Sequence, residues 1–156
     1  MISLGGIRFG LVGAGAIAQS YVQAIEECEG AELVAVADVR EEAAAAAAHV
    51  AGCKSFTSYE EMLRDVPFDA AIVCTPPGIH PEICIRLLES GVHVLCEKPL
   101  AVSSEQAAAM LGAAKKSGNK FTMASKFRFV EDVVKAKSIV TSGMIGEVIL
   151  LSLIHI

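Results

Sequence analysis

The sequence has little of what marks several large classes of protein. Its 13 lysines and arginines are outnumbered by 18 aspartates and glutamates, and it has no basic cluster beyond Lys115-Lys116, which argues against nucleic acid as a partner. No uncharged apolar run approaches the roughly 20 residues that a membrane helix needs, and no basic N-terminal region precedes a long apolar core. We therefore expect neither a membrane span nor a signal peptide.

Motifs for metal binding and nucleophilic catalysis are also missing. No two histidines have metal-ligand spacing, and no GxSxG sequence is present, so we expect no metal site and no serine nucleophile. The five cysteines form no CxxC pair. Cys74 and Cys96 fall in apolar, strand-like runs, where free thiols behave as small hydrophobic groups. This usage favours a reducing compartment, the cytoplasm.

The most informative stretch is the glycine motif Gly13-x-Gly15-x-x-Ala18, which follows the apolar run Ile7 to Val12. Tyr21, Ile25 and Cys28 then follow Ile17 at the spacing of one helix face. The pattern predicts a strand, a tight turn and the start of a helix. In such a turn the first glycine lets the chain reverse, the second leaves room for a pyrophosphate, and the small Ala18 lets helix and strand pack closely.

The start of this helix is suited to hold phosphates. The free N–H groups of its first turn, where Ala16 and Ile17 lie, and the positive end of the helix dipole would face them. A second strand, Glu32 to Ala37, ends in Asp38, 20 residues beyond Ala18, where a carboxylate should meet the adenosine ribose hydroxyls of NAD. Arg40 leaves the alternative open, because its guanidinium would suit the 2′-phosphate of NADP.

Apolar runs alternate with helical patterns along the rest of the chain. We predict strands over 7–12, 32–37, 54–57, 69–74, 92–96 and 120–124. Capping boxes at Ser58-x-x-Glu61 and Ser103-x-x-Gln106 open two of the intervening helices. The alternation predicts an α/β fold with a doubly wound parallel sheet, the Rossmann arrangement, in strand order 3-2-1-4-5-6. The ends of strands one, four and five should then share a crevice.

Two strand ends carry residues suited to line that crevice. Thr75-Pro76-Pro77 ends the fourth strand, and His80 follows near the start of the next helix, where it either touches a cofactor or caps the helix. Glu97-Lys98-Pro99 ends the fifth strand. Lys98 is the candidate catalytic residue, since a lysine beside a cofactor can transfer a proton or hold a substrate hydroxyl, and the alternative is a surface lysine.

Residues 126–156 do not belong to the predicted sheet. Arg128, within Lys126-Phe127-Arg128-Phe129, suits a phosphate or an acidic substrate, or is simply solvated. A helix is predicted over Glu131 to Thr141 and a strand over Val148 to Ile156. That strand is apolar on both faces, and its edges need hydrogen-bonding partners. We therefore expect the chain to self-associate through it as a homo-oligomer.

Taken together, these motifs resemble the glucose–fructose oxidoreductase/inositol dehydrogenase (Gfo/Idh/MocA) family. The likeness rests on the glycine motif, Asp38, Cys74-Thr75-Pro76-Pro77 with His80, Glu97-Lys98-Pro99-Leu100, and the late Ser142-Gly143-Met144-Ile145-Gly146-Glu147. A proline expected after Arg128 is missing, with Val130 nearby. The resemblance implies an NAD(P)-dependent oxidoreductase acting on a sugar, cyclitol or related hydroxy compound. The lysine matching Lys98 then lies near the nicotinamide and assists proton removal.

The resemblance also divides the chain. Residues 1–125 correspond to a dinucleotide-binding domain, and residues 126–156 to a connecting helix and the first strand of a second α/β domain that supplies most of the substrate pocket. We therefore expect this chain to bind a dinucleotide without a complete catalytic site. A non-catalytic binding module, serving as redox sensor or partner subunit, remains the alternative, as does hydrolysis or elimination through a transient oxidation.

Overall fold

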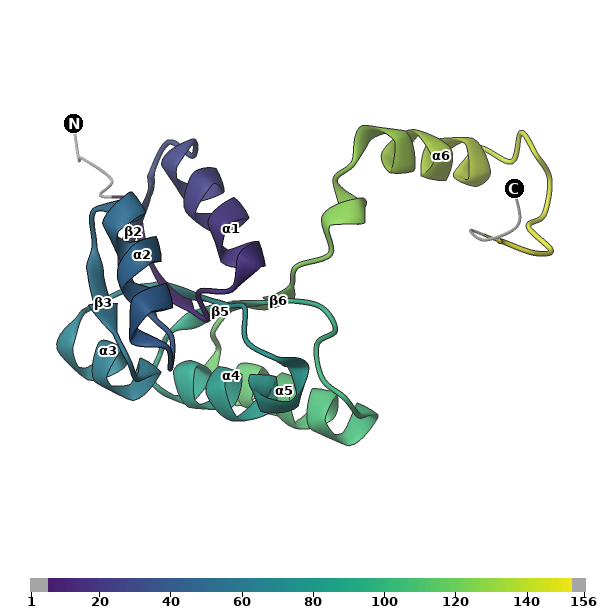
Figure 1. Ribbon diagram of the computed structural model, residues 1–156. Coiled ribbons are helices and arrows are strands. Elements are labelled where there is room, and N and C mark those ends of the chain that lie inside the picture. Colours follow the sequence, from purple (N-terminus) through teal and green to yellow (C-terminus); the bar gives the residue numbers. More distant parts are fainter. Residues whose placement is uncertain (1–5, 153–156) are drawn as a thin grey trace, which may run out of the picture. The chain divides into compact units, whose positions relative to one another are not determined.

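A single parallel sheet organises the N-terminal four-fifths of the chain (Figure 1). The structure, a computed structural model, describes residues 6–152. Six strands lie in the order β3-β2-β1-β4-β5-β6, which confirms the predicted order. The strands are β1 Ile7–Val12, β2 Ala31–Ala37, β3 Lys54–Phe56, β4 Ala70–Val73, β5 His93–Cys96 and β6 Phe121–Met123. Every pairing is parallel, so all the carboxyl ends lie along one edge.

Helices connect the strands, and two of them, α3 and α5, begin at the capping serines that the sequence predicts. They are α1 Ala16–Glu26, α2 Glu41–Ala51, α3 Tyr59–Asp65, α4 His80–Glu89 and α5 Ser104–Ser117, with the short 3-10 helix η1 Pro77–Ile79. The Ser58 side chain accepts hydrogen bonds from the backbone N–H groups of Glu60 and Glu61, and Ser103 accepts one from that of Gln106. Both side chains satisfy helix donors that have no partner within the helix.

The helices cover the two faces of the sheet in separate layers. One apolar cluster joins the strands to α3, α4 and α5, with Met62, Leu87 and Met110 fully buried. The other joins the opposite face to α1 and α2. Neighbouring residues of β1 show the division, since Leu11 belongs to the second cluster and Val12 to the first. This two-sided burial explains why the strands lack polar alternation.

An ion pair closes the edge of the sheet opposite the carboxyl ends. The Arg8 side chain donates to both carboxylate oxygens of Asp69, at 2.8 and 3.1 Å, and the Arg8 backbone N–H donates to the same carboxylate at 2.9 Å. The backbone N–H of Asp69 in turn donates to the Arg8 carbonyl. These bonds link two segments 61 residues apart at the starts of β1 and β4.

After Ala124 the chain enters a second compact unit. Its described residues form the 3-10 helix η2 Lys126–Arg128 and the helix α6 Glu131–Thr141, none of whose residues is buried. The predicted strand over 148–156 is wrong for residues 148–152, which form neither strand nor helix, and its last four residues lie outside the described ones. A strand forms only beside another strand, and all six strands of the described sheet lie within residues 7–123.

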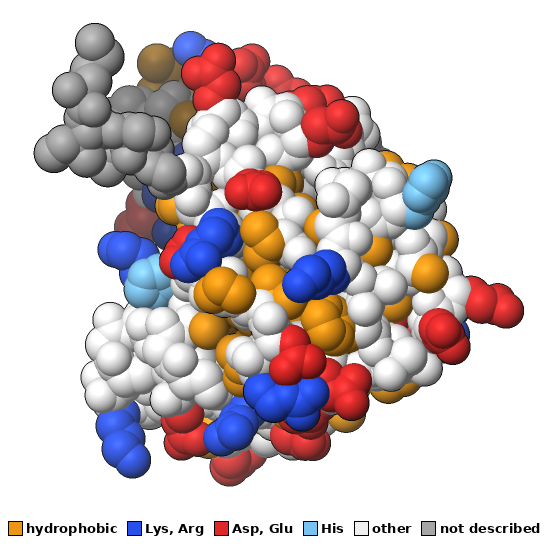
Figure 2. Space-filling view, turned by 90° about the vertical axis from the view of Figure 1, so that its left-hand side faces the viewer, with side chains coloured by type: hydrophobic (Ala, Val, Ile, Leu, Met, Phe, Trp, Pro, Cys, Tyr) orange, Lys and Arg blue, Asp and Glu red, His pale blue; other side chains and the backbone are white. Residues whose placement is uncertain are grey.

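The expected self-association depended on the edge of that strand. Residues 148–152 form no strand, so this described part has no strand edge for pairing. Among residues 6–152, no helix has the length and apolar content to cross a membrane. Figure 2 shows one face of the molecule, on which apolar side chains gather at the centre and charged side chains of both signs surround them. Neither sign of charge dominates that face.

The Arg8–Asp69 pair predicts an acid-sensitive contribution to stability. Hydrogen bonds from the Arg8 side chain and backbone lower the pKa of Asp69 to about 2, against about 3.9 for an unfolded aspartate. Because the folded-state pKa is the lower one, the contribution is complete above about pH 4 and is lost as the pH falls towards 2. Asp69→Asn should lower the Tm at pH 7, and its difference from wild type should shrink between pH 4 and pH 2 in circular dichroism melts.

Asp65→Asn provides the matched control. Asp65 is also paired with an arginine, but its partner Arg64 is the adjacent residue, so the pair joins no distant segments. We expect a smaller loss of Tm from Asp65→Asn at pH 7. A wild-type advantage over Asp69→Asn that stays constant from pH 5 to pH 2 would contradict the assignment.

Candidate functional site

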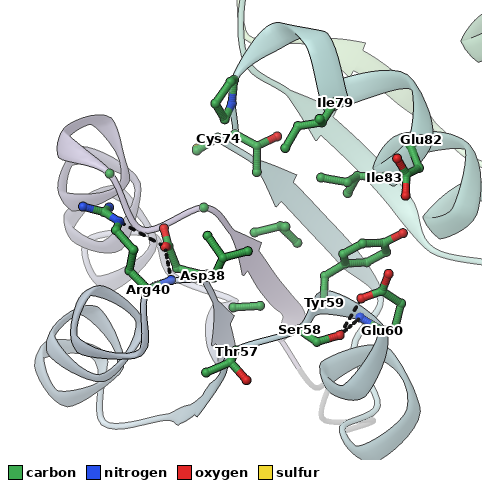
Figure 3. A pocket seen from close by; sticks show the side chains of 17 residues that line it. Asp38, Arg40, Thr57, Ser58, Tyr59, Glu60, Cys74, Ile79, Glu82 and Ile83 are labelled. Carbon is green, nitrogen blue, oxygen red and sulfur yellow. Dashed lines mark hydrogen bonds and ion pairs between the residues drawn. The ribbon is translucent and has the colours of Figure 1, made fainter.

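A cleft of about 740 Å³ opens at the carboxyl ends of β1, β2 and β4 (Figure 3). Six residues named from the sequence line it: Gly13, Gly15, Asp38, Arg40, Thr75 and Pro76. They come from three separate stretches of chain, which the parallel order brings together at β1 and its two neighbours. The cleft therefore lies where the strand order reverses, the usual ligand position in open α/β sheets.

The glycine turn forms the floor of this cleft. Gly13 has a φ of +93°, and a Cβ there would lie 2.8 Å from the Cys74 carbonyl carbon at the end of β4. Both the backbone conformation and the close approach of β4 thus require glycine. Gly15 differs, because its φ of −75° suits any residue and a Cβ there would have no atom within 4 Å. Gly15 is the N-cap residue of α1. Because glycine has no side chain, the start of this helix is uncapped and the space beside it is open.

Asp38 lies beside the glycine turn and is held there in a fixed orientation. One carboxylate oxygen accepts the Ala14 N–H at 2.7 Å, and the other accepts the Arg40 backbone N–H at 2.8 Å and its Nε at 3.3 Å. Burial opposes the charge of this side chain, but the hydrogen bonds from Arg40 and Ala14 outweigh it and lower the pKa of Asp38. The carboxylate is therefore ionised at neutral pH, and it ties β2 to the glycine turn.

The salt bridge leaves Arg40 free on its outer side. The Arg40 side chain is 67% exposed, whereas that of Asp38 is 10% exposed. Figure 3 shows the guanidinium reaching back over Asp38 at one side of the cleft. Asp38 and Arg40, the two residues expected to contact the adenosine ribose, thus lie together, and the Asp38 carboxylate is the more buried of the two groups.

The opposite lobe of the cleft was not identified from the sequence. It is lined by Ile79 and Ile83 from the η1–α4 segment and by Tyr59, Glu60 and Glu82. Burial, followed by the nearby charge of Glu60, raises the pKa of Tyr59 to about 12. The capping box at Ser58 was interpreted only as a helix start. Its position directly after β3, the neighbour of β2, is the signal that would have placed it at the cleft.

The end of β4 contributes two further polar groups. The Thr75 hydroxyl oxygen is buried and has no hydrogen-bond partner among the described residues. Cys74 is also a lining residue, and burial, with the charge of Glu97 nearby, raises the pKa of its thiol to about 12. Cys74 is therefore a protonated thiol rather than a nucleophile. Pro77 lies one residue beyond the lining Pro76, in η1.

His80 is completely buried and is not among the residues lining the cleft. Its Nε2 lies 2.7 Å from the Thr75 carbonyl oxygen, while Nδ1 lies 3.1 and 3.3 Å from the carbonyl oxygens of Pro99 and Leu100. The imidazole thus links the end of β4 to the segment after β5. It stands at the first position of α4, and no side-chain capping bond is present there.

The Glu97-Lys98-Pro99 corner lies at the carboxyl end of β5, beside that of β4. Glu97 is half-buried, and its carboxylate is held by the Tyr21 hydroxyl at 2.7 Å and by the Lys98 backbone N–H at 2.8 Å. The Lys98 side chain is exposed and is not among those lining the cleft. The Lys98–Pro99 peptide bond is cis.

The remaining candidates lie at the helix start and in the second unit. Ala16 and Ile17 form the first turn of α1, directly after Gly15, and Ile17 is 45% exposed. Arg128 ends η2 and is exposed. Within residues 6–152 no three histidine, cysteine or acidic side chains are grouped so as to hold a metal ion. All five cysteines are free thiols.

Comparisons with known proteins agree with this geometry. The profile of the GFO_IDH_MocA oxidoreductase family, described as its NAD-binding Rossmann fold, matches residues 7–125. The chain is 37% identical over 145 residues to D-glucoside 3-dehydrogenase of Escherichia coli (strain K12), and 32% identical over 142 residues to inositol 2-dehydrogenase of Rhizobium meliloti (strain 1021). Each alignment covers 91% of this chain, but 41% and 43% of the relative.

A solved structure gives the same result. The WlbA dehydrogenase from Bordetella pertussis, in complex with NADH and UDP-GlcNAcA, superposes with a TM-score of 0.87 at 34% identity. The match covers 90% of this chain and 43% of that one, so the chain spans about two-fifths of the length of the proteins it matches. On these grounds the chain belongs to the GFO_IDH_MocA oxidoreductase family, and residues 7–125 form its NAD-binding Rossmann fold.

Proposed function

We propose that the cleft holds NAD(H), with its diphosphate at the glycine turn, as part of an oxidoreductase that acts on a sugar, polyol or related hydroxy compound. The observation that carries this proposal is the open start of α1. Gly15 lines the cleft as the N-cap residue of α1, with open space at its Cβ position, and no side chain caps the N–H groups of the first helical turn. A helix start of this kind attracts phosphate through its N–H groups and its dipole.

Two further features of the cleft fit the same ligand. The buried Thr75 hydroxyl has no partner among the described residues, and a ligand group in the cleft would satisfy it. The ionised Asp38 carboxylate has about four lone-pair sites, of which the Ala14 N–H and the two Arg40 donors use three, so it can still accept one ribose hydroxyl. A bound nicotinamide supplies hydride transfer to or from a substrate carbon.

Asp38 favours NAD over NADP in this proposal. Its carboxylate is the inner group of the corner and repels a 2′-phosphate. Arg40 lies outside it and is already paired with that carboxylate, which reduces its attraction for a second anion. NAD is therefore the proposed cofactor, and NADP the weaker ligand.

Lys98 is the proposed acid–base residue. It follows β5 at the edge of the sheet where parallel strands place ligands, on the opposite side of the glycine turn from Asp38. In this place its amine can hold a substrate hydroxyl and accept or return the proton. Glu97 beside it is held by two hydrogen bonds, which keeps the corner in one orientation.

The remaining assignments complete the proposal. Residues 1–125 act as the dinucleotide domain, and residues 126–156, with Arg128, lead into a substrate-binding domain. The relatives' printed names support the substrate class, since they include D-glucoside 3-dehydrogenase and inositol 2-dehydrogenase. Five free thiols support a reducing compartment, the cytoplasm.

Direct binding of NADH tests the proposed function. Gly15→Ala should fold normally, because the new methyl group meets no protein atom, yet it should weaken NADH binding about tenfold or more by filling space beside the phosphates. Isothermal titration calorimetry and thermal melts measure the two effects. Gly13→Ala is the contrasting variant, since its methyl group would collide with the β4 backbone and lower the Tm. Wild-type protein that binds no NADH at millimolar concentration would overturn the proposal.

The charge at position 38 should set the cofactor preference. We expect wild type to bind NADH more tightly than NADPH, and Asp38→Asn to reduce that preference about tenfold, since it removes one charge repulsion. Glu60→Gln is the control, because this carboxylate lines the opposite lobe of the cleft and should leave the ratio unchanged. Fluorescence titration with both cofactors decides the matter, and tighter binding of NADPH by wild type would contradict the assignment.

Turnover should need more than the polypeptide of residues 1–156. With NAD⁺ and either myo-inositol or D-glucose, we expect binding of the cofactor without an increase in absorbance at 340 nm. The physical reason is that the proposed substrate pocket draws most of its groups from the second domain. Turnover at an ordinary enzymatic rate by this polypeptide alone would show that the catalytic site is complete within it.

A further inference from the structure

Tyr21 connects the two halves of the proposed cofactor site. It lies on α1, the helix that begins at the glycine turn, and its hydroxyl donates to Glu97 Oε1 at 2.7 Å. The other carboxylate oxygen of Glu97 accepts the Lys98 backbone N–H at 2.8 Å. One helix therefore contacts the phosphate-binding turn at its start and the Glu97-Lys98 corner through its side chain.

The surroundings of the Tyr21–Glu97 hydrogen bond keep the Tyr21 hydroxyl protonated and bonded to the carboxylate. Tyr21 and Glu97 are both half-buried, and they join segments 76 residues apart. Burial, together with the hydrogen bond to Glu97, raises the pKa of Tyr21, so the hydroxyl remains a donor. A hydrogen bond to a carboxylate is stronger than one between neutral groups.

The positions of Asp38, Gly15 and Glu97 along the strand ends indicate which part of a bound dinucleotide would lie near the Tyr21–Glu97 hydrogen bond. Asp38 ends β2 on one side of β1, whereas Glu97 ends β5 beyond β4 on the other side. An adenosine at Asp38 and a diphosphate at Gly15 leave the nicotinamide half for the β4–β5 side. The Tyr21–Glu97 bond thus lies at the nicotinamide end.

We propose that Tyr21 is a positioning residue, whose hydroxyl orients Glu97 and through it the Lys98 backbone, so that α1 sets the place of the nicotinamide-side corner relative to the phosphate-binding turn. This inference rests on the proposed function, since it assumes that NAD(H) occupies the cleft. Tyr21 itself is not among the residues that line the cleft.

Tyr21→Phe tests the inference, because it keeps the packed ring and removes only the hydroxyl. We expect NADH binding to weaken about three- to tenfold, the size expected for losing one hydrogen bond that orders a contact surface. Binding of ADP-ribose, which lacks the nicotinamide, should change less than twofold, or about 0.4 kcal/mol. A purely structural role would weaken both ligands alike or neither, and either result would overturn the inference.

Two controls separate the link from general effects on α1. Gln23→Ala removes another side-chain hydrogen bond of the same helix, to Glu27 at 2.8 Å, and should leave both ligands unaffected. In a Glu97→Ala background, Tyr21→Phe should cause no further loss of NADH affinity, since its partner is already absent. Losses of NADH affinity that add up in the double variant would contradict the inference. Wild-type protein that binds neither ADP-ribose nor NADH would refute the proposed function instead.

Discussion

The close approach of two backbones, at Gly13 and the end of β4, is the constraint on which the site depends. The 2.8 Å between a Cβ at Gly13 and the Cys74 carbonyl carbon leaves no room for any side chain. This approach lets β1 and β4 remain hydrogen-bonded neighbours up to Val12 and Val73 while the chain reverses into α1. The helix start and the end of β4 then form one corner, and the cleft opens above it.

Carboxylates fix the loops around that corner. Asp38 bonds the Ala14 N–H from β2, and Glu97 bonds the Tyr21 hydroxyl from β5, so each ties a strand end to the segment around α1. Both acids were selected from the sequence for contacts with a cofactor. In the structure their first task is to hold protein groups, and only their remaining lone pairs are available to a ligand. A site preorganised in this way loses less entropy on binding.

Buried His80 performs a related task without a charge partner. It joins the end of β4 to Pro99 and Leu100, which follow the Lys98 corner, and therefore braces that corner from the side of α4. The corner is thus held from both faces of the sheet, by Tyr21 on α1 and by His80 on α4. Support from two sides fixes the position of such a corner more closely than either contact would alone.

The order of the elements and the glycine corner were determined by the sequence itself. Helical and strand periodicity, the capping serines and Gly13-x-Gly15-x-x-Ala18 are local patterns, and each acts through residues only a few positions apart. They predicted the six strands and their order. The same approach was wrong about a strand over residues 148–152, because strand formation depends on a neighbour that no local pattern can supply.

Only the tertiary structure decided which groups meet in the cleft and which do not. It brought Tyr59, Glu60 and Glu82 into the lobe opposite Asp38, enclosed His80 among backbone carbonyls, and paired Tyr21 with Glu97 across 76 residues. These contacts arise from strand order and helix packing, which bring distant residues within hydrogen-bonding range. Sequence spacing carries no information on such pairs, since the distance between their atoms is set by the assembled sheet rather than by the chain that joins them.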